Sequence, residues 1–200
     1  MVRKRGRPSK SIDPVDAKKK FLDSAIRLIG ERGIEAVTLN NILNESGLSN
    51  GTFYHHFQNI DDLMITIVKE LSFDSIELAT PLEQFPDRIC ELYDHLIDHY
   101  LCLGIEFMKR FYTTRNQGLA SYMYEIDGHF AEGTAMARCE QEIQTAISER
   151  ILSPGTDAHE LSGDICTIVK GCLFDWAMSD LTIDVRENMR RLLRRYLSHY

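Results

Sequence analysis

The spacing of apolar residues restricts the fold of this chain more firmly than any other feature. From Pro86 onward, apolar residues recur every three or four positions in each segment, and the apolar–polar alternation of a half-buried strand is sustained nowhere. Breaks at proline, glycine and aspartate clusters predict helices over residues 87–101, 105–114, 118–151, 157–179 and 184–198. The third of these has room for a kink at Gly128 or Gly133. The chain is therefore predicted to be all-α.

Shorter helices are predicted in the first third of the chain. Asp13 and Pro14 are typical of a helix start, and Gly33 is typical of the helix end that follows. Caps and a turn then come in quick succession at Thr38, Ser46-Gly47-Leu48, Ser49 and Asn59. We therefore expect a disordered basic arm of residues 1–12, a three-helix domain of residues 13–60, and a C-terminal helical domain of residues 61–200.

Charge is unevenly distributed along the chain. The formal net charge is −7, yet the first ten residues hold five basic residues and no acid. Acidic residues outnumber basic ones from residue 71 onward. Because a polyanion is attracted to the basic end and repelled by the remainder, this distribution points to a polyanionic partner at the N-terminus.

Residues 38–57 have the pattern of a helix-turn-helix. Gly47 suits a left-handed turn between two short helices, and the apolar residues around it are spaced to form a small core between them. In such a motif the second helix enters the major groove of double-stranded DNA, where hydroxyls and amides bond phosphates or base edges. That helix would present Ser49, Asn50, Thr52, Tyr54 and His55, with Gly51 allowing close approach of the backbone. The alternative is a plain helical hairpin with no nucleic-acid partner.

The same residues carry a family resemblance. The run Gly47–Phe57 closely resembles the recognition segment of the TetR family of bacterial regulators, and the similarity extends through Phe21–Leu63. The resemblance implies that Thr38 and Tyr54 contact the DNA backbone, while the other residues of the second helix lie in or beside the groove. It also implies a homodimer, a nine-helix fold and an effector pocket in the C-terminal domain.

Two positions depart from the family pattern. Many members place a lysine at the start of the fourth helix as a phosphate clamp, whereas this chain has Ile60 followed by acids. Leu43 stands where alanine is usual. We therefore expect one phosphate contact, and the packing of the first helices, to differ from the family pattern.

The basic arm contains a second DNA-binding signal. Arg5-Gly6-Arg7-Pro8 resembles the core of an AT-hook, in which arginines beside a glycine insert into the narrow A·T minor groove. Arg3, Arg5 and Arg7 are the predicted contacts. The alternative is a solvated basic tail that attracts DNA through its charge alone.

The last two predicted helices carry continuous apolar stripes. Such stripes serve either as a dimerisation surface or as part of the chain's own core, and the family resemblance favours dimerisation. A dimer also suits DNA, since two recognition helices about 34–36 Å apart read a pseudo-palindromic operator. The predicted interface residues are Leu161, Ile165, Ile168, Val169, Cys172, Val185, Met189, Leu192, Leu193 and Tyr196.

Aromatic residues and methionines are frequent in the middle helices. Most are expected in the core, but large adaptable side chains also line cavities for apolar ligands. The resemblance implies such a pocket for an unidentified small-molecule effector, and the predicted lining residues are Tyr93, Tyr100, Phe107, Phe111, Tyr122 and Trp176.

Other classes of function find little support. The chain lacks a GxSxG elbow, a phosphate loop, an HExxH pair and a recognisable Cys–His arrangement, so neither an enzyme nor a cofactor is expected. The five scattered cysteines are expected to be buried thiols, and His95 and His99 to belong to a solvated face rather than a metal site. No apolar run suits a membrane span and no signal peptide is recognisable, so we expect a cytoplasmic protein with no membrane partner.

These features predict a homodimeric transcription regulator, a repressor that a small ligand releases from its operator. The ligand is expected to shift a helix around residues 60–79 and so change the separation of the two recognition helices. The alternative is a ligand-independent architectural protein that prefers A·T-rich DNA.

Overall fold

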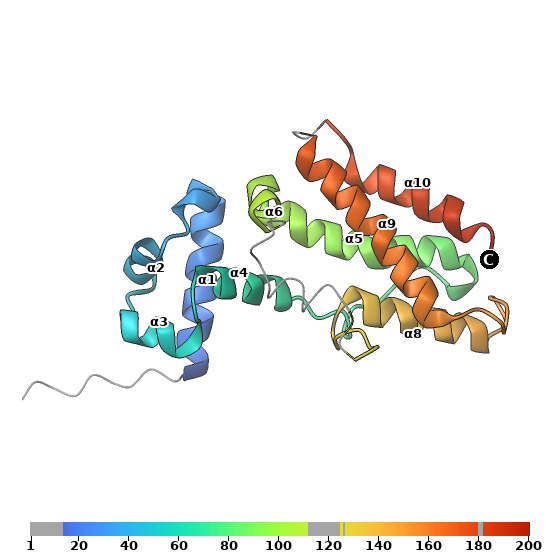
Figure 1. Ribbon diagram of the computed structural model, residues 1–200, viewed down its shortest axis with the longest axis horizontal. Coiled ribbons are helices and arrows are strands. Elements are labelled where there is room, and N and C mark those ends of the chain that lie inside the picture. The colour runs from blue at the N-terminus through green and yellow to red at the C-terminus, as the bar shows by residue number, and fades with distance from the viewer. Residues whose placement is uncertain (1–13, 112–124, 126, 180–181) are drawn as a thin grey trace, which may run out of the picture. The chain divides into compact units, whose positions relative to one another are not determined.

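The computed structural model describes residues 14–111, 125, 127–179 and 182–200, which are predominantly helical (Figure 1). No β-strand occurs among these residues, and the all-α prediction is confirmed. The α-helices are α1 (Pro14–Arg32), α2 (Leu39–Ser46), α3 (Asn50–His56), α4 (Ile60–Lys69), α5 (Phe85–Leu103), α6 (Ile105–Phe111), α8 (Ala135–Ser148), α9 (Ala158–Met178) and α10 (Val185–Leu197). Short 3-10 helices precede α2 and α5, at Ile34–Ala36 and Leu82–Gln84.

The chain divides into two compact units, one ending at Met64 and the other beginning at Ile65. The division falls within α4, slightly later than the position expected from the sequence. Within the described ranges, no helix combines the length and the apolar character needed to cross a membrane.

The N-terminal unit is built on an aromatic core. Phe21 of α1 is fully buried and meets Phe53 of α3 edge-on, with ring centroids 5.4 Å apart. Phe57, just after α3, lies 6.1 Å from Phe21 and 5.4 Å from Phe53. Ile42 of α2 is buried as well. Helices α1, α2 and α3 thus share one small core, which includes Ile42 and Phe53 as the sequence predicts.

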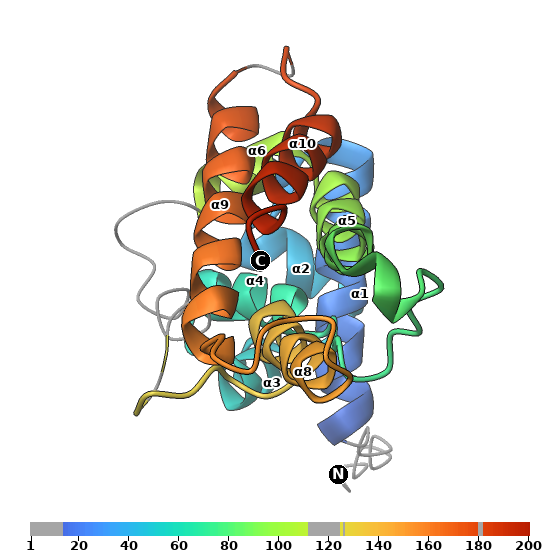
Figure 2. The ribbon, with the colours of Figure 1, turned by 90° about the vertical axis from the view of Figure 1, so that its right-hand side faces the viewer.

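Four helices form the body of the C-terminal unit. α8 and α10 each pack against both α5 and α9 (Figure 2). Apolar stripes at helical spacing meet between them and exclude water, which is the main stabilising contribution to such a bundle. Among the buried side chains here are Ile89, Tyr93, Ile97, Cys139, Ile143, Ile165, Val169, Met189 and Leu193.

The prediction of a single helix over residues 118–151 is wrong. Residues 127–134 are turn or irregular structure, with positive φ angles at Asp127, Gly128 and Gly133, and α8 begins only at Ala135. The Thr134 side chain caps α8 by accepting a hydrogen bond from the backbone of the third residue beyond it. Residues 112–124 lie outside the described part.

The helix predicted around residues 60–79 is also too long. α4 ends at Lys69, and residues 71–81 are irregular or turn structure. Several backbone groups of this segment bond to side chains of α5 and α8, which replaces the regular hydrogen bonding of a helix.

Two smaller expectations need correction. Four cysteines are buried, but Cys102 is exposed. His99 is half-buried rather than solvated, and burial lowers its pKa. In the part of the chain that the structure describes, no group of histidine, cysteine and carboxylate side chains is arranged to hold a metal ion.

Candidate nucleic-acid interface

α2 and α3 form the predicted helix-turn-helix, and each begins with a hydroxyl cap. Thr38 Oγ1 accepts from the Asn41 amide at 3.3 Å, and Ser49 Oγ accepts from the Thr52 amide at 3.1 Å. Between the helices, Gly47 has a φ of 67°, and its amide donates to the Leu43 carbonyl at 3.0 Å. These bonds fix the turn that orients α3.

The face of α3 opposite the buried Phe53 is exposed and polar. Asn50, Gly51, Tyr54 and His55 share this face because residues four apart lie one above the other on a helix. Tyr54 is 55% exposed. Space beside Gly51 is open, since a Cβ there would meet only Ser49 Oγ, at 3.8 Å. A DNA backbone could therefore approach α3 closely at this residue.

The remaining predicted contacts are placed as follows. Ser49 and Thr38 are exposed at the starts of their helices. Thr52 is half-buried, and its Oγ1 lies 2.8 Å from Ser49 Oγ, so these two hydroxyls act as a bonded pair. The arm residues predicted to enter the minor groove, Arg3, Arg5 and Arg7, lie outside the described residues.

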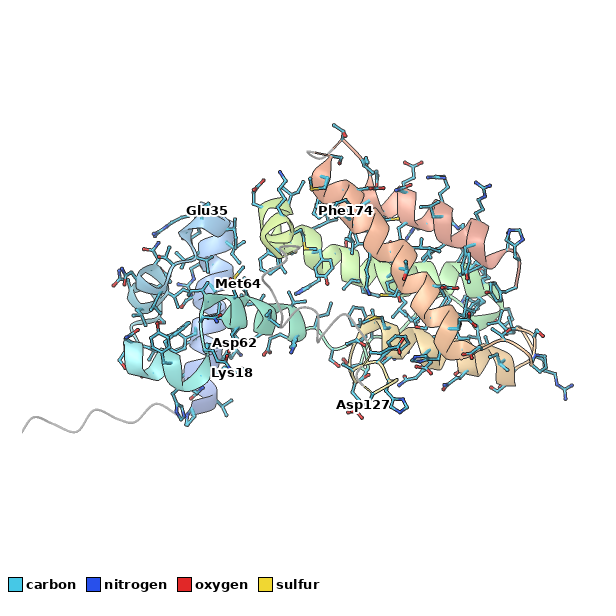
Figure 3. The ribbon with its side chains drawn as sticks, in the orientation of Figure 1. Lys18, Glu35, Asp62, Met64, Asp127 and Phe174 are labelled. Atoms are coloured by element: carbon cyan, nitrogen blue, oxygen red, sulfur yellow. The ribbon has the colours of Figure 1, made fainter. Side chains whose placement is uncertain are left out.

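The two adjacent histidines of α3 have different environments. His55 is exposed, whereas His56 is half-buried with its ring 6.5 Å from that of Phe21. Burial, followed by the nearby charges of His55 and Lys18 (labelled in Figure 3), lowers the pKa of His56. His56 is therefore neutral at physiological pH, and His55 is the one placed to approach a phosphate.

The start of α4 shows what replaces the lysine of the family pattern. Asn59 Oδ1 accepts from the Asp62 amide at 2.9 Å, and Asp62 Oδ2 accepts from the Gln58 amide at 2.9 Å. These two bonds resemble a capping box, with the return bond made to the residue before the cap, and they stabilise the helix start within the chain. Ile60, half-buried beside it, offers DNA no charge.

The predicted dimer residues are divided between two faces. Seven are at most 3% exposed in the single chain and pack largely into its own core: Leu161, Ile165, Val169, Cys172, Val185, Met189 and Leu193. Of these, Cys172 also lines the groove described next. Ile168, Leu192 and Tyr196 instead line an open groove of about 490 Å³ between α9 and α10. Phe174, 51% exposed, lies on the same helix as Ile168 (Figure 3).

The groove also contains residues that the sequence argument missed. They are mostly polar, so a search for apolar stripes passes over them. All but Thr167 lie three or seven residues after Ile168 or Leu192, which is the helical spacing that could have identified them. They are Thr167, Gly171, Asp175, Arg195 and His199.

Only part of the predicted effector set lines a cavity. Tyr93 and Tyr100 do, in a space of about 30 Å³ within the C-terminal unit. Phe107 and Trp176 are buried but are not among the residues that line it. Tyr122 and the side chain of Phe111 lie outside the described residues. The other lining residues are Leu96, Thr134, Ala135, Met136, Cys166, Val169, Lys170 and Leu173.

Tyr93 brings a polar group to this cavity. The hydroxyl is fully buried beside the Cys139 thiol and has no hydrogen-bond partner of ordinary geometry in the described residues. Burial raises the pKa of Tyr93 well above its usual value and that of Cys139 to about 12. Both groups therefore stay protonated, and the Tyr93 hydroxyl is available to donate to a ligand.

Comparisons with known proteins agree with this geometry. Residues 21–67 match the family model of bacterial regulatory proteins, tetR family. The chain is 23% identical over 146 residues to the fatty acid metabolism regulator protein of Bacillus subtilis, covering 66% of this chain and 75% of the relative. The curated relatives are named as regulators, so the chain is a regulator and not an enzyme.

Solved structures extend the likeness over both units. The fatty acid degradation regulator FadR from Bacillus halodurans has a TM-score of 0.55 at 16% identity, covering 94% of this chain and 96% of that one. The multidrug binding protein EbrR complexed with ethidium has a TM-score of 0.55 at 17% identity, covering 90% and 97%. At these identities the likeness shows the fold. The family model covers the helix-turn-helix, so residues 21–67 form a DNA-binding segment of the tetR family of bacterial regulatory proteins.

Proposed function

We propose that the chain is a homodimeric repressor that a small, mostly apolar ligand releases from a pseudo-palindromic operator. The exposed polar face of α3 carries this proposal. Phe53 anchors the helix from behind, and Ser49 caps its start, so the hydroxyl, amide and imidazole groups are held in fixed positions. Such groups on a rigid helix suit the edges and phosphates of a major groove.

The groove between α9 and α10 supports a homodimer. Ile168, Leu192 and the ring of Tyr196 offer apolar surface, while Asp175 and Arg195 carry opposite charges at the same groove. In a two-fold symmetric dimer every contact between two different residues occurs twice. Asp175 of one protomer can therefore face Arg195 of its partner, and the reverse pair repeats the contact. A second copy is therefore the occupant that fits this surface.

The cavity beside Tyr93 supports a ligand-responsive role. Its lining is mainly apolar, and the polar side chains in it are those of Tyr93, Tyr100, Thr134 and Lys170. Two relatives are named as regulators of fatty acid metabolism and degradation, and EbrR was solved with ethidium. We therefore propose that the effector is an extended or planar apolar molecule.

Selection of bound sequences from random duplex DNA tests the proposal directly. The full chain is expected to enrich one pseudo-palindrome, with affinity that falls steeply as salt rises. Dodecanoate and ethidium are the first probes for release of the enriched duplex. A pool with no enriched sequence would overturn the proposed function.

Deletion of residues 1–12 separates the repressor from the architectural alternative. A repressor lacking the arm is expected to bind more weakly but to keep its preference for the enriched sequence. Complete loss of binding would favour an A·T-binding architectural protein instead, because the arm would then supply all the affinity.

A further inference from the structure

The segment between α4 and α5, residues 70–80, is called the connector below. Its first half is fastened to α8. Arg138 Nη1 donates to the carbonyls of Phe73 and Asp74, at 3.3 and 3.1 Å. Backbone carbonyls that are free of a helix thereby receive a charged donor, which gives a strong hydrogen bond.

The second half of the connector is fastened to α5. Arg88 Nη1 donates to the carbonyls of Leu78 and Thr80, at 3.3 and 2.5 Å. The amides of Ala79 and Thr80 donate to the Glu91 carboxylate, each at 2.7 Å. Burial raises the pKa of Glu91, but these hydrogen bonds outweigh burial and lower it, so the carboxylate is ionised.

Glu142 of α8 holds both arginines in place. Its Oε2 accepts from Arg88 Nε at 2.6 Å, and its Oε1 accepts from Arg138 Nε at 2.9 Å. Glu142 is 6% exposed, and the two arginine side chains are each 17% exposed. Because buried charges are stable only while paired, loss of this carboxylate would release both guanidinium groups. Arg88, Arg138 and Glu142 are called the clamp.

The connector is also bonded to one wall of the cavity. The Phe73 amide donates to the Gly133 carbonyl at 2.9 Å. Gly133 has a φ of +75°, and a Cβ there would lie 3.3 Å from Ser72 Oγ. The next three residues, Thr134, Ala135 and Met136, line the cavity of about 30 Å³. A volume that holds little more than one water cannot admit a larger ligand unless its walls move.

We propose that the clamp transmits occupancy of the cavity to the DNA-binding unit, an inference that rests on the proposed function. A ligand that displaces the first turn of α8 moves Gly133 and Arg138 together, and their bonds to residues 72–74 break. The connector continues directly into α4, whose residues 60–64 belong to the N-terminal unit. The closed clamp holds α4 in the DNA-binding state, and its opening is the signal for release.

The variant Glu142→Gln tests the clamp without a ligand. The amide has the size of the carboxylate but no charge, so both arginines lose their ionic partner. Peptides covering residues 72–80 are expected to exchange backbone hydrogen for deuterium at least about tenfold faster, with α9 and α10 unchanged. Asp87→Asn is the matched control, because it removes an exposed pair with Arg194 from the same helix α5.

A gentler variant guards against misfolding of Glu142→Gln. Arg138→Lys keeps the positive charge but lacks the forked donors that reach Glu142 and two carbonyls at once. It is expected to speed exchange at residues 72–74 and to leave residues 78–80 protected. Exchange rates at residues 72–80 that are the same in both variants as in the wild type would overturn the proposal.

The variant Ala135→Leu imitates an occupied cavity, because a larger side chain forces the first turn of α8 outward. Exchange at residues 72–80 is expected to rise, and affinity for the enriched operator to fall by at least about tenfold. Ala158→Leu, at the first position of α9, is the control. In the double variant that combines Ala135→Leu with Glu142→Gln, the loss of operator affinity is expected to equal the larger of the two single losses, because both changes act through the clamp. Losses that multiply would contradict this shared action.

These measurements separate failure of the clamp from failure of the proposed function. If the wild-type protein enriches no DNA sequence, the proposed function fails, and exchange in Ala135→Leu still decides whether the cavity wall controls the connector. If the wild-type protein binds an operator but Ala135→Leu changes neither exchange nor affinity, the clamp proposal fails and the proposed function stands.

Discussion

Ser49 has two roles that substitutions can separate. Its hydroxyl caps α3, and it is exposed at the start of that helix. Ser49→Ala removes the cap and is expected to lower the free energy of unfolding by about 0.5–2 kcal/mol. Ser49→Asp keeps a capping oxygen but adds a negative charge where phosphates approach, so stability is retained while operator affinity falls about tenfold or more. Thermal unfolding and DNA titration measure the two effects, and wild-type affinity in Ser49→Asp would contradict the assigned interface.

His159 makes the stability of the C-terminal unit depend on pH. Its ring nitrogens each lie 3.3 Å from a carboxylate, of Glu140 and Glu125, and its ring stacks on Phe130. Burial lowers the pKa of His159, but the two carboxylates outweigh burial and raise it. The folded state then holds the proton more tightly than the unfolded chain. The resulting stability is complete below the unfolded pKa of about 6.5 and is lost as pH rises through the raised value.

The variant His159→Gln isolates this contribution. The difference in Tm between wild type and variant is expected to be largest near about pH 6 and to shrink toward about pH 8, because the wild-type proton is lost over that range. Thermal unfolding at intervals of pH measures it. A difference that stays constant or grows with pH would contradict the assignment.

At the level of elements, α10 is fastened to α5 by a ladder of arginines at four-residue intervals. Arg190 bonds the buried Asp94, with Nε to Oδ2 at 2.9 Å, and Arg186 bonds Asp98, whose side chain is 60% exposed. Since a buried carboxylate depends on its partners far more than a solvated one, Asp94→Asn is expected to lower the free energy of unfolding by about 1–3 kcal/mol. Asp98→Asn is expected to cost less than about 1 kcal/mol. If denaturant titrations gave equal losses of unfolding free energy for the two variants, burial of the carboxylate would not be what determines its contribution.

The sequence predicts elements well where the signals are local. Thr38 and Ser49 cap α2 and α3 as expected, because a cap depends only on residues within one turn. The start of α8 could not be predicted in this way. The turn before it is fixed by the bond from Phe73 to Gly133, between residues far apart in the sequence. The early end of α4 has the same cause, since backbone carbonyls in the segment after it accept hydrogen bonds from Arg88 and Arg138, which lie far away in the sequence.

The predicted dimer surface shows a different limit. α9 is apolar on more than one face, with Ile165 and Val169 turned to the chain's own core and Ile168 turned to the groove. Helical periodicity identifies residues that avoid water, but it does not identify which body covers them. Assigning each apolar residue of α9 to the core or to the groove requires knowing where α5 and α8 pack. The spacing of residues within α9 gives no information on that.

At the scale of the whole molecule, the groove between α9 and α10 decides whether two recognition helices act together. Ile168→Glu places a charge in the groove without entering the buried core, so the chain is expected to fold as a monomer. Because two linked contacts exceed one by about 10²–10⁴ in affinity, binding to the full operator is expected to fall at least about a hundredfold, with half-site binding unchanged. Leu101→Glu, at a 43% exposed position of α5, is the matched control. Sedimentation and titration with whole and half operators measure both effects. A variant that stays dimeric with full affinity would place the interface elsewhere.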